Sequence, residues 1–193
     1  MDDPQLTYAT LDQLEAERKL RSIPACLLES TWTREAQVEA VVDALLVATT
    51  VDDLRAYAHA RNTGEWAARI ATALPCSPGA AFMRRCGVLA DVDPAVLQRV
   101  PEVREYAAVV RAFQALRVAG IGEDDGVQTA ALIVATAEEF DAMICAPDAT
   151  CAHSPSAVLR EMFHSATPES KPILHALVRA IPNAPADLSA TVE

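Results

Sequence analysis

The stretch ALLVATTVDDLRAYA, residues 44–58, decides how the chain is interpreted, because it returns in altered form as ALIVATAEEFDAMI at residues 131–144. In each copy a hydrophobic run leads to a threonine that is followed by two acidic residues. Thr50 and Thr136 each stand three positions before a carboxylate. This is the spacing of a capping box, in which the two side chains satisfy backbone N–H groups at a helix start. Both copies therefore predict a helix, a sharp corner and a second helix.

Two explanations of this similarity stay open. The copies could descend from an internal duplication, or they could match by chance, because the chain contains 38 alanines and short runs of Ala, Leu and Val recur easily. A weaker echo at residues 115–125 fits no single period with the other two, so the sequence does not indicate a regular solenoid. We expect helical hairpins packed side by side.

The remaining sequence predicts an all-α fold. Hydrophobic residues make up 51% of the chain and charged residues 22%, a balance typical of globular proteins. No β-hairpin turn and no run of alternating hydrophobic residues is found. We predict about nine to twelve short helices, packed as hairpins in an irregular bundle or repeat-like array around a central helix at residues 101–119. One all-α domain should span residues 1–182, and residues 183–193 should form a flexible tail.

Several helix boundaries follow from local signals. Proline after a capping residue marks a helix start, since its missing N–H would be unpaired there anyway. Asn62-Thr63-Gly64 resembles a turn and should end the helix that follows Thr50. For the last helix, Ser170 is an alternative cap to Thr167. The predicted starts are at Thr33 and at four residues that precede a proline, Ser77, Asp93, Ser154 and Thr167.

Composition excludes several classes of function. A net charge of −11 argues against nonspecific binding to nucleic acid or to an anionic membrane. The first residues show no signal peptide, and no apolar stretch reaches the ~20 residues that span a bilayer. We expect a soluble, cytoplasmic protein that binds neither nucleic acid nor membrane. The five scattered cysteines favour free thiols in a reducing compartment.

Two acidic surfaces are candidate partner-binding sites. Residues 118–159 contain seven carboxylates and no Lys or Arg, and a stripe of three carboxylates recurs every four residues on a predicted helix. Ordinary solvated helix faces would also explain both patterns, whereas the functional interpretation is docking of a basic partner. The candidate residues are Glu123, Asp124, Asp125, Glu138, Glu139 and Asp141, together with the stripe of Glu35, Glu39 and Asp43.

Chemistry is less well supported. Thiolate and imidazole ligands suit zinc, but the spacing of the available residues matches no known zinc motif. The chain has no nucleophile elbow, P-loop, dinucleotide fingerprint or H-E-x-x-H sequence. We predict no metal, no cofactor and no catalytic residue. A disulfide between Cys145 and Cys151, or two unreactive thiols, both remain open. The residues considered for zinc are Cys145, Cys151, His153 and His164.

These observations favour a non-enzymatic interaction protein, such as an adaptor, a structural subunit of a larger assembly, or an inhibitor. Its partner would be a protein with a basic surface, and the chain itself could be part of a homo-oligomer or of a hetero-complex. The alternative is a small α-helical enzyme or ligand-binding protein with a pocket between helices. Salt-sensitive binding would distinguish the first hypothesis.

Overall fold

The computed structural model describes residues 33–75, 77–119, 125–145 and 154–182. Regular secondary structure within these residues is helical throughout, which confirms the all-α prediction. They form eight α-helices and one 3₁₀ turn, whereas the predicted nine to twelve referred to the whole chain. The predicted tail lies outside the described residues. The elements are α2 (Arg34–Thr49), α3 (Leu54–Ala73), α4 (Ala80–Val88), α5 (Pro94–Arg99), η2 (Arg104–Tyr106), α6 (Ala107–Ala119), α7 (Asp125–Ile144), α8 (Pro155–Ser165) and α9 (Lys171–Ala180).

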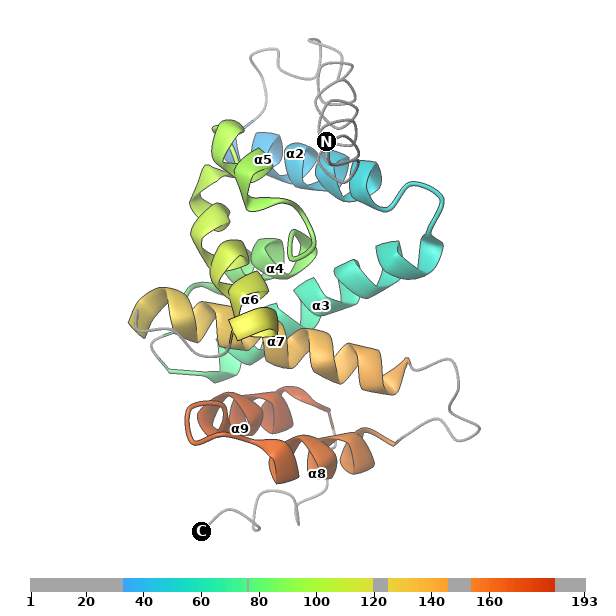
Figure 1. The fold of residues 1–193 in the computed structure, drawn as a ribbon, viewed down its shortest axis with the longest axis vertical. Helices are drawn as coiled ribbons and strands as arrows, with labels where there is room; N and C mark the ends of the chain where they lie inside the picture. Colours follow the sequence, from blue (N-terminus) through green and yellow to red (C-terminus); the bar gives the residue numbers. More distant parts are fainter. Residues whose placement is uncertain (1–32, 76, 120–124, 146–153, 183–193) are drawn as a thin grey trace, which may run out of the picture.

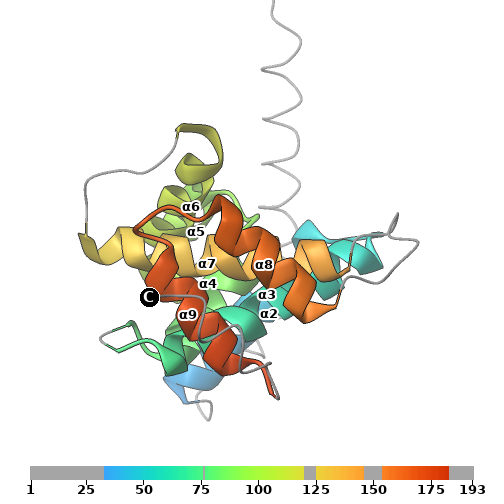
Figure 2. The ribbon, with the colours of Figure 1, turned by 90° about the horizontal axis from the view of Figure 1, so that it is seen from below.

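The two 20-residue helices, α3 and α7, pack against each other in the middle of the molecule (Figure 1). Helix α4 packs mainly on α3, and α6 packs on α7. Helices α8 and α9 lie below α7, as the view from below also shows (Figure 2), and α9 packs mainly on α3. Helix α2 lies at the opposite end and contacts α3 and α4.

A central α-helix over residues 101–119 is not what the structure has. Residues 101–103 form a turn, η2 follows, and α6 begins at Ala107. Val103 and Tyr106, three positions apart, are both buried, and a 3₁₀ turn places residues at this spacing on the same side. The backbone of Val103, with φ −120° and ψ 4°, is not helical, so the α-helix begins only after the 3₁₀ turn. The most extensively packed helices are α3 and α7.

Small and branched aliphatic side chains build the core, with a few aromatics between them. Trp66 of α3 and Phe140 of α7 meet edge to face, with ring centroids 4.9 Å apart. Phe113 of α6 and Tyr106 are also completely or almost completely buried. Within the described part of the chain, no helix is both apolar and long enough to cross a bilayer.

The corner predicted after Thr50 is present, but its chemistry differs from a capping box. The Thr50 hydroxyl donates to the carbonyl of Leu46 at 2.7 Å and so belongs to the end of α2. Asp53 begins α3, since its carboxylate accepts from two backbone N–H groups at 2.9 Å. Between them Asp52 has a φ of 70°, a left-handed conformation that reverses the chain direction.

The second predicted corner is wrong, because α7 runs straight through Thr136 to Ile144. Thr136 is followed by Ala-Glu-Glu, which are good helix formers, whereas Thr50 is followed by Val-Asp-Asp, which are poor ones. The buried face of α7 also continues past the threonine to Phe140. Propensity and burial together therefore continue the second helix where the first one ends.

The turn predicted at residues 62–64 is also wrong, because α3 continues to Ala73. Gly64 lies on the buried face, where α3 crosses α4 at Gly87. A Cβ on Gly87 would lie 2.8 Å from the Gly64 Cα, so the two backbones touch. The glycine is therefore explained by close helix packing and does not indicate a turn.

Three of the five predicted helix starts are confirmed. The side chains of Thr33, Asp93 and Ser154 each accept a hydrogen bond from the first turn of the helix that follows. Thr167 is not the cap of α9, which begins after Ser170 as in the alternative considered. Ser77 is also not a cap, because its hydroxyl donates back to an α3 carbonyl and α4 begins three residues later.

Candidate functional site

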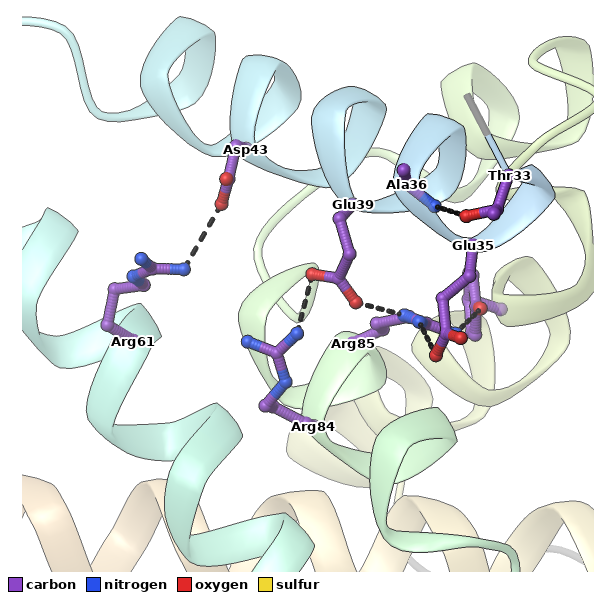
Figure 3. Close-up of polar contacts among 9 residues, drawn as sticks. Thr33, Glu35, Ala36, Glu39, Asp43, Arg61, Arg84 and Arg85 are labelled. Atoms are coloured by element: carbon purple, nitrogen blue, oxygen red, sulfur yellow. Dashed lines mark hydrogen bonds and ion pairs between the residues drawn. The ribbon is translucent and has the colours of Figure 1, made fainter. Parts of the chain in front are cut away.

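Glu39 projects from α2 toward two consecutive arginines of α4 (Figure 3). One carboxylate oxygen accepts from Nη2 of Arg84 at 2.5 Å, and the other accepts from Nε of Arg85 at 2.7 Å. Partial burial acts to raise the pKa of Glu39, but the hydrogen bonds and charges of the two arginines outweigh it and lower the pKa. The Nη1 of Arg85 also donates to the hydroxyl of Tyr106 at 3.3 Å. This carboxylate therefore ties α2 to α4.

Figure 3 also shows the contacts of the other two carboxylates of the stripe, which are more exposed than Glu39. Glu35 accepts from Nη2 of Arg85 at 3.2 Å, and Asp43 accepts from Nη1 of Arg61 in α3 at 3.1 Å. Solvent-exposed pairs of this kind contribute only about 0–1 kcal/mol. All three stripe carboxylates thus face arginines of their own chain. Their contact with a basic partner stays a prediction.

The second predicted surface is only partly described. Glu123 and Asp124 lie outside the described residues, and of Asp125 the structure describes only the backbone at the start of α7. The remaining three carboxylates all lie on α7, but they have different surroundings. Glu138 meets an arginine, Asp141 is buried, and Glu139 lines a groove.

Asp141 is buried, with 3% of its surface exposed. Its Oδ2 lies 2.7 Å from Nδ1 of His59 in α3, and its Oδ1 accepts from the Cys145 thiol at 3.8 Å. The hydrogen bond with Asp141 raises the pKa of His59 and outweighs the opposing effect of partial burial. Because a carboxylate only accepts, Nδ1 carries the proton, which leaves Nε2 as the imidazole atom for proton exchange.

This arrangement does not make a thiol nucleophile. Cys145 donates to Asp141, whereas a cysteine nucleophile lies beside an imidazole or a positive charge that favours its thiolate. Burial and the Asp141 charge raise the pKa of the Cys145 thiol, which further disfavours the thiolate. The chemistry that the geometry supports is a histidine that is oriented through Nδ1 by a buried carboxylate.

The sequence interpretation missed His59 as a functional candidate. One signal was available, because Asp141 follows Ala137 by four positions and so falls on the buried stripe of α7. A carboxylate at such a position requires a partner. The sequence does not reveal that this partner is His59, because His59 lies 82 residues away in the chain.

Glu138 is part of an ion-pair network that joins α7, α6 and the turn after α4. Arg117 of α6 donates from Nη1 to Asp91 and from Nη2 to Glu138, each at 3.1 Å. Burial raises the pKa of Glu138, although the charge of Arg117 acts to lower it. The predicted partner contact at Glu138 is therefore occupied by a cation of the same chain.

Glu139 lies on the wall of a groove of about 360 Å³ formed by α6, α7, α8, α9 and the α8–α9 turn. Partial desolvation and the nearby charge of Glu161 in α8 raise the pKa of Glu139. Among the described residues no Lys or Arg forms an ion pair with Glu139. The residues that line the groove are Leu116, Leu132, Ala135, Thr136, Glu139, Met162, Ser165, Ala166, Thr167, Ser170 and Leu174.

No group of three or more His, Cys, Asp or Glu side chains in the described ranges is arranged to hold a metal ion. Cys145 has an exposed, free thiol. Cys151, the predicted disulfide partner and a candidate zinc ligand, lies outside the described residues. His153, another candidate zinc ligand, also lies outside them.

Comparison with known proteins adds no relative, since no family model, no curated protein and no solved structure matches the chain. Function is therefore inferred from the site itself.

Proposed function

We propose that the protein is a non-enzymatic interaction protein that binds a basic protein partner through an acidic surface on α7 and α8. The observation that carries this proposal is the position of Glu139. It is exposed, it lies near a second exposed carboxylate, Glu161, and no described cation pairs with it. Two like charges held near each other are stabilised by a cation from outside the chain.

The other predicted carboxylates with described side chains give weaker support. Each already has a basic partner within the chain, either an arginine or His59. A partner would have to displace that contact, whereas Glu139 can accept a cation without any loss. Glu139 is therefore the member of the predicted set that we assign to partner binding.

The charge of the whole chain agrees with a basic partner. A net charge of −11 speeds the approach of a positively charged protein and makes the binding sensitive to salt.

The proposal is tested by capture of the tagged full chain from its own cells at about 0.05 M and about 0.5 M salt, with mass spectrometry of the bound proteins. The wild type is compared with the double variant Glu139→Lys, Glu161→Lys. Glu65→Lys, an exposed position on α3, is the matched control. We expect a basic protein that binds wild type and control, and that is lost at high salt and in the double variant. Failure to capture a basic protein, or capture that neither salt nor charge reversal reduces, would refute the proposal.

The alternative, a ligand-binding protein or enzyme, is favoured by the His59–Asp141 pair. A buried carboxylate that orients an imidazole is a common device for proton transfer. Neither residue lines the groove, however, so the pair and the groove are separate features. A small ligand that raises the Tm of the wild type but not of Asp141→Asn would support this alternative.

A further inference from the structure

We propose that the groove is the docking site for an amphipathic helical segment of the basic partner, with apolar side chains in the groove and a Lys or Arg against Glu139. This inference rests on the proposed function and adds the site and the chemistry of the bound segment.

The apolar part of the groove comes from four helices. Leu116 of α6, Leu132 of α7, Met162 of α8 and Leu174 of α9 converge on it. Ala135 lies between them on α7, and its small side chain leaves the space open. A volume of about 360 Å³ is at the small end of protein binding pockets, which span roughly 300–1,000 Å³. It can receive individual side chains, as in the helix-in-groove mode of recognition.

The acidic side chain of the groove lies at a helical spacing from its apolar lining. Glu139 follows Ala135 by four positions, so its carboxylate lies one helical turn beyond the apolar lining. Glu161 of α8 lies near it and adds a second negative charge. A segment with a leucine-like residue and a Lys or Arg one turn away would place both groups correctly.

The negative charge of the groove disfavours other classes of ligand. Phosphate groups of nucleic acid or of a lipid surface would face the Glu139 carboxylate and be repelled. A segment with Glu in place of Lys would meet the same repulsion. An apolar segment without charge would leave Glu139 close to Glu161 without a counter-ion.

The first experiment uses NMR of the ¹⁵N-labelled full chain with two synthetic helical peptides. Both have the same leucine pattern, one with lysines and the other with glutamates at the remaining positions. We expect the Leu/Lys peptide to shift the amides of residues 132–139, 162–167 and 170–174, and the Leu/Glu peptide to leave them unchanged. Shifts that map elsewhere, or equal binding of both peptides, would overturn the docking site.

The second experiment measures the Leu/Lys peptide affinity of groove variants. Glu139→Gln should weaken binding about two- to fivefold, the range of an exposed ion pair. Ala135→Leu and Ala166→Leu, which fill the groove from two walls, should each weaken it by about tenfold or more. The controls are Glu65→Gln and Ala142→Leu, which are exposed outside the groove and should bind as the wild type does. Unchanged affinity in both filled variants would overturn the proposal, and their amide spectra verify that they are folded.

The two proposals fail separately. If a basic partner captured from cells binds Ala135→Leu and Ala166→Leu as tightly as the wild type, the groove is not its docking site, although the interaction function stands. If cells yield no basic partner but the Leu/Lys peptide occupies the groove with the expected variant effects, the proposed function fails and the groove remains a peptide-binding site.

Discussion

Replacing Gly87 by alanine should destabilise the fold, even though alanine is the better helix former. Gly87 lies in α4 at its crossing with α3. An added Cβ would lie 2.8 Å from the Gly64 Cα, 2.9 Å from the Gly64 nitrogen and 2.9 Å from the Thr63 carbonyl oxygen. All three are backbone atoms of a helix, so no side chain can turn aside to relieve the contact. The two helices would have to separate.

The magnitude follows from two opposing effects. Ordinary contact begins at 3.4 Å, so the helices would separate by about 0.6 Å at this point. Overpacking of this kind costs about 1–3 kcal/mol, and we take the upper end because backbone meets backbone. Alanine in place of glycine returns about 1 kcal/mol of helix propensity. The net loss of unfolding free energy is about 2 kcal/mol, which lowers the Tm of a chain of this size by about 4–8 °C.

Urea and thermal unfolding followed by circular dichroism would measure this loss. The matched control is Gly126→Ala in the first turn of α7, where an added Cβ meets no atom within 4 Å. The control should be as stable as the wild type or slightly more stable. If Gly87→Ala unfolds at the same urea concentration as the control, the α3–α4 crossing does not depend on glycine and the reasoning is wrong.

Three further predictions concern ionisable groups. Because Asp141 raises the pKa of His59 above 6.5, the stability from this pair is fully present below pH 6.5 and is lost as the pH rises through the folded-state pKa. Urea unfolding between about pH 6 and pH 9 should show this loss in the wild type and not in His59→Gln, and equal pH profiles would contradict it. Glu39→Gln should cost about 1–2 kcal/mol in unfolding free energy, against less than about 0.5 kcal/mol for the exposed Asp43→Asn, and equal costs would argue against the α2–α4 tie. Cys86, which is 0% exposed and whose thiol pKa is raised by burial, should resist iodoacetamide until the protein unfolds. Peptide mass spectrometry checks this, and rapid alkylation of the native protein would contradict it.

Most of the confirmed predictions depended on only a few neighbouring residues. The capping side chains of Asp93 and Ser154 act on N–H groups two or three residues away, so their role was visible in the sequence. The turn assigned to Gly64 failed because glycine serves two purposes, a left-handed turn and close helix packing. Only the position of Gly87 across the α3–α4 crossing distinguishes them.

The candidate site was also predicted only in part. Acidic residues on α7 were recognised from composition, and Glu139 was among them. The sequence could not separate it from Glu138, its immediate neighbour, because the difference is the presence of Arg117 beside one and of the groove beside the other. Both depend on residues of other helices.

By itself the sequence determined the helical class, the corner at Thr50 and the hydrophobic faces, since helix propensity, capping and periodicity act within about four residues. The tertiary structure decided which helices continue, which carboxylates are neutralised and where the groove forms. Glu39 meets arginines 45 and 46 residues away, and Asp141 meets a histidine 82 residues away. Charge pairing and packing act through space, so neighbours in sequence such as Glu138 and Glu139 acquire different roles only when the chain is folded.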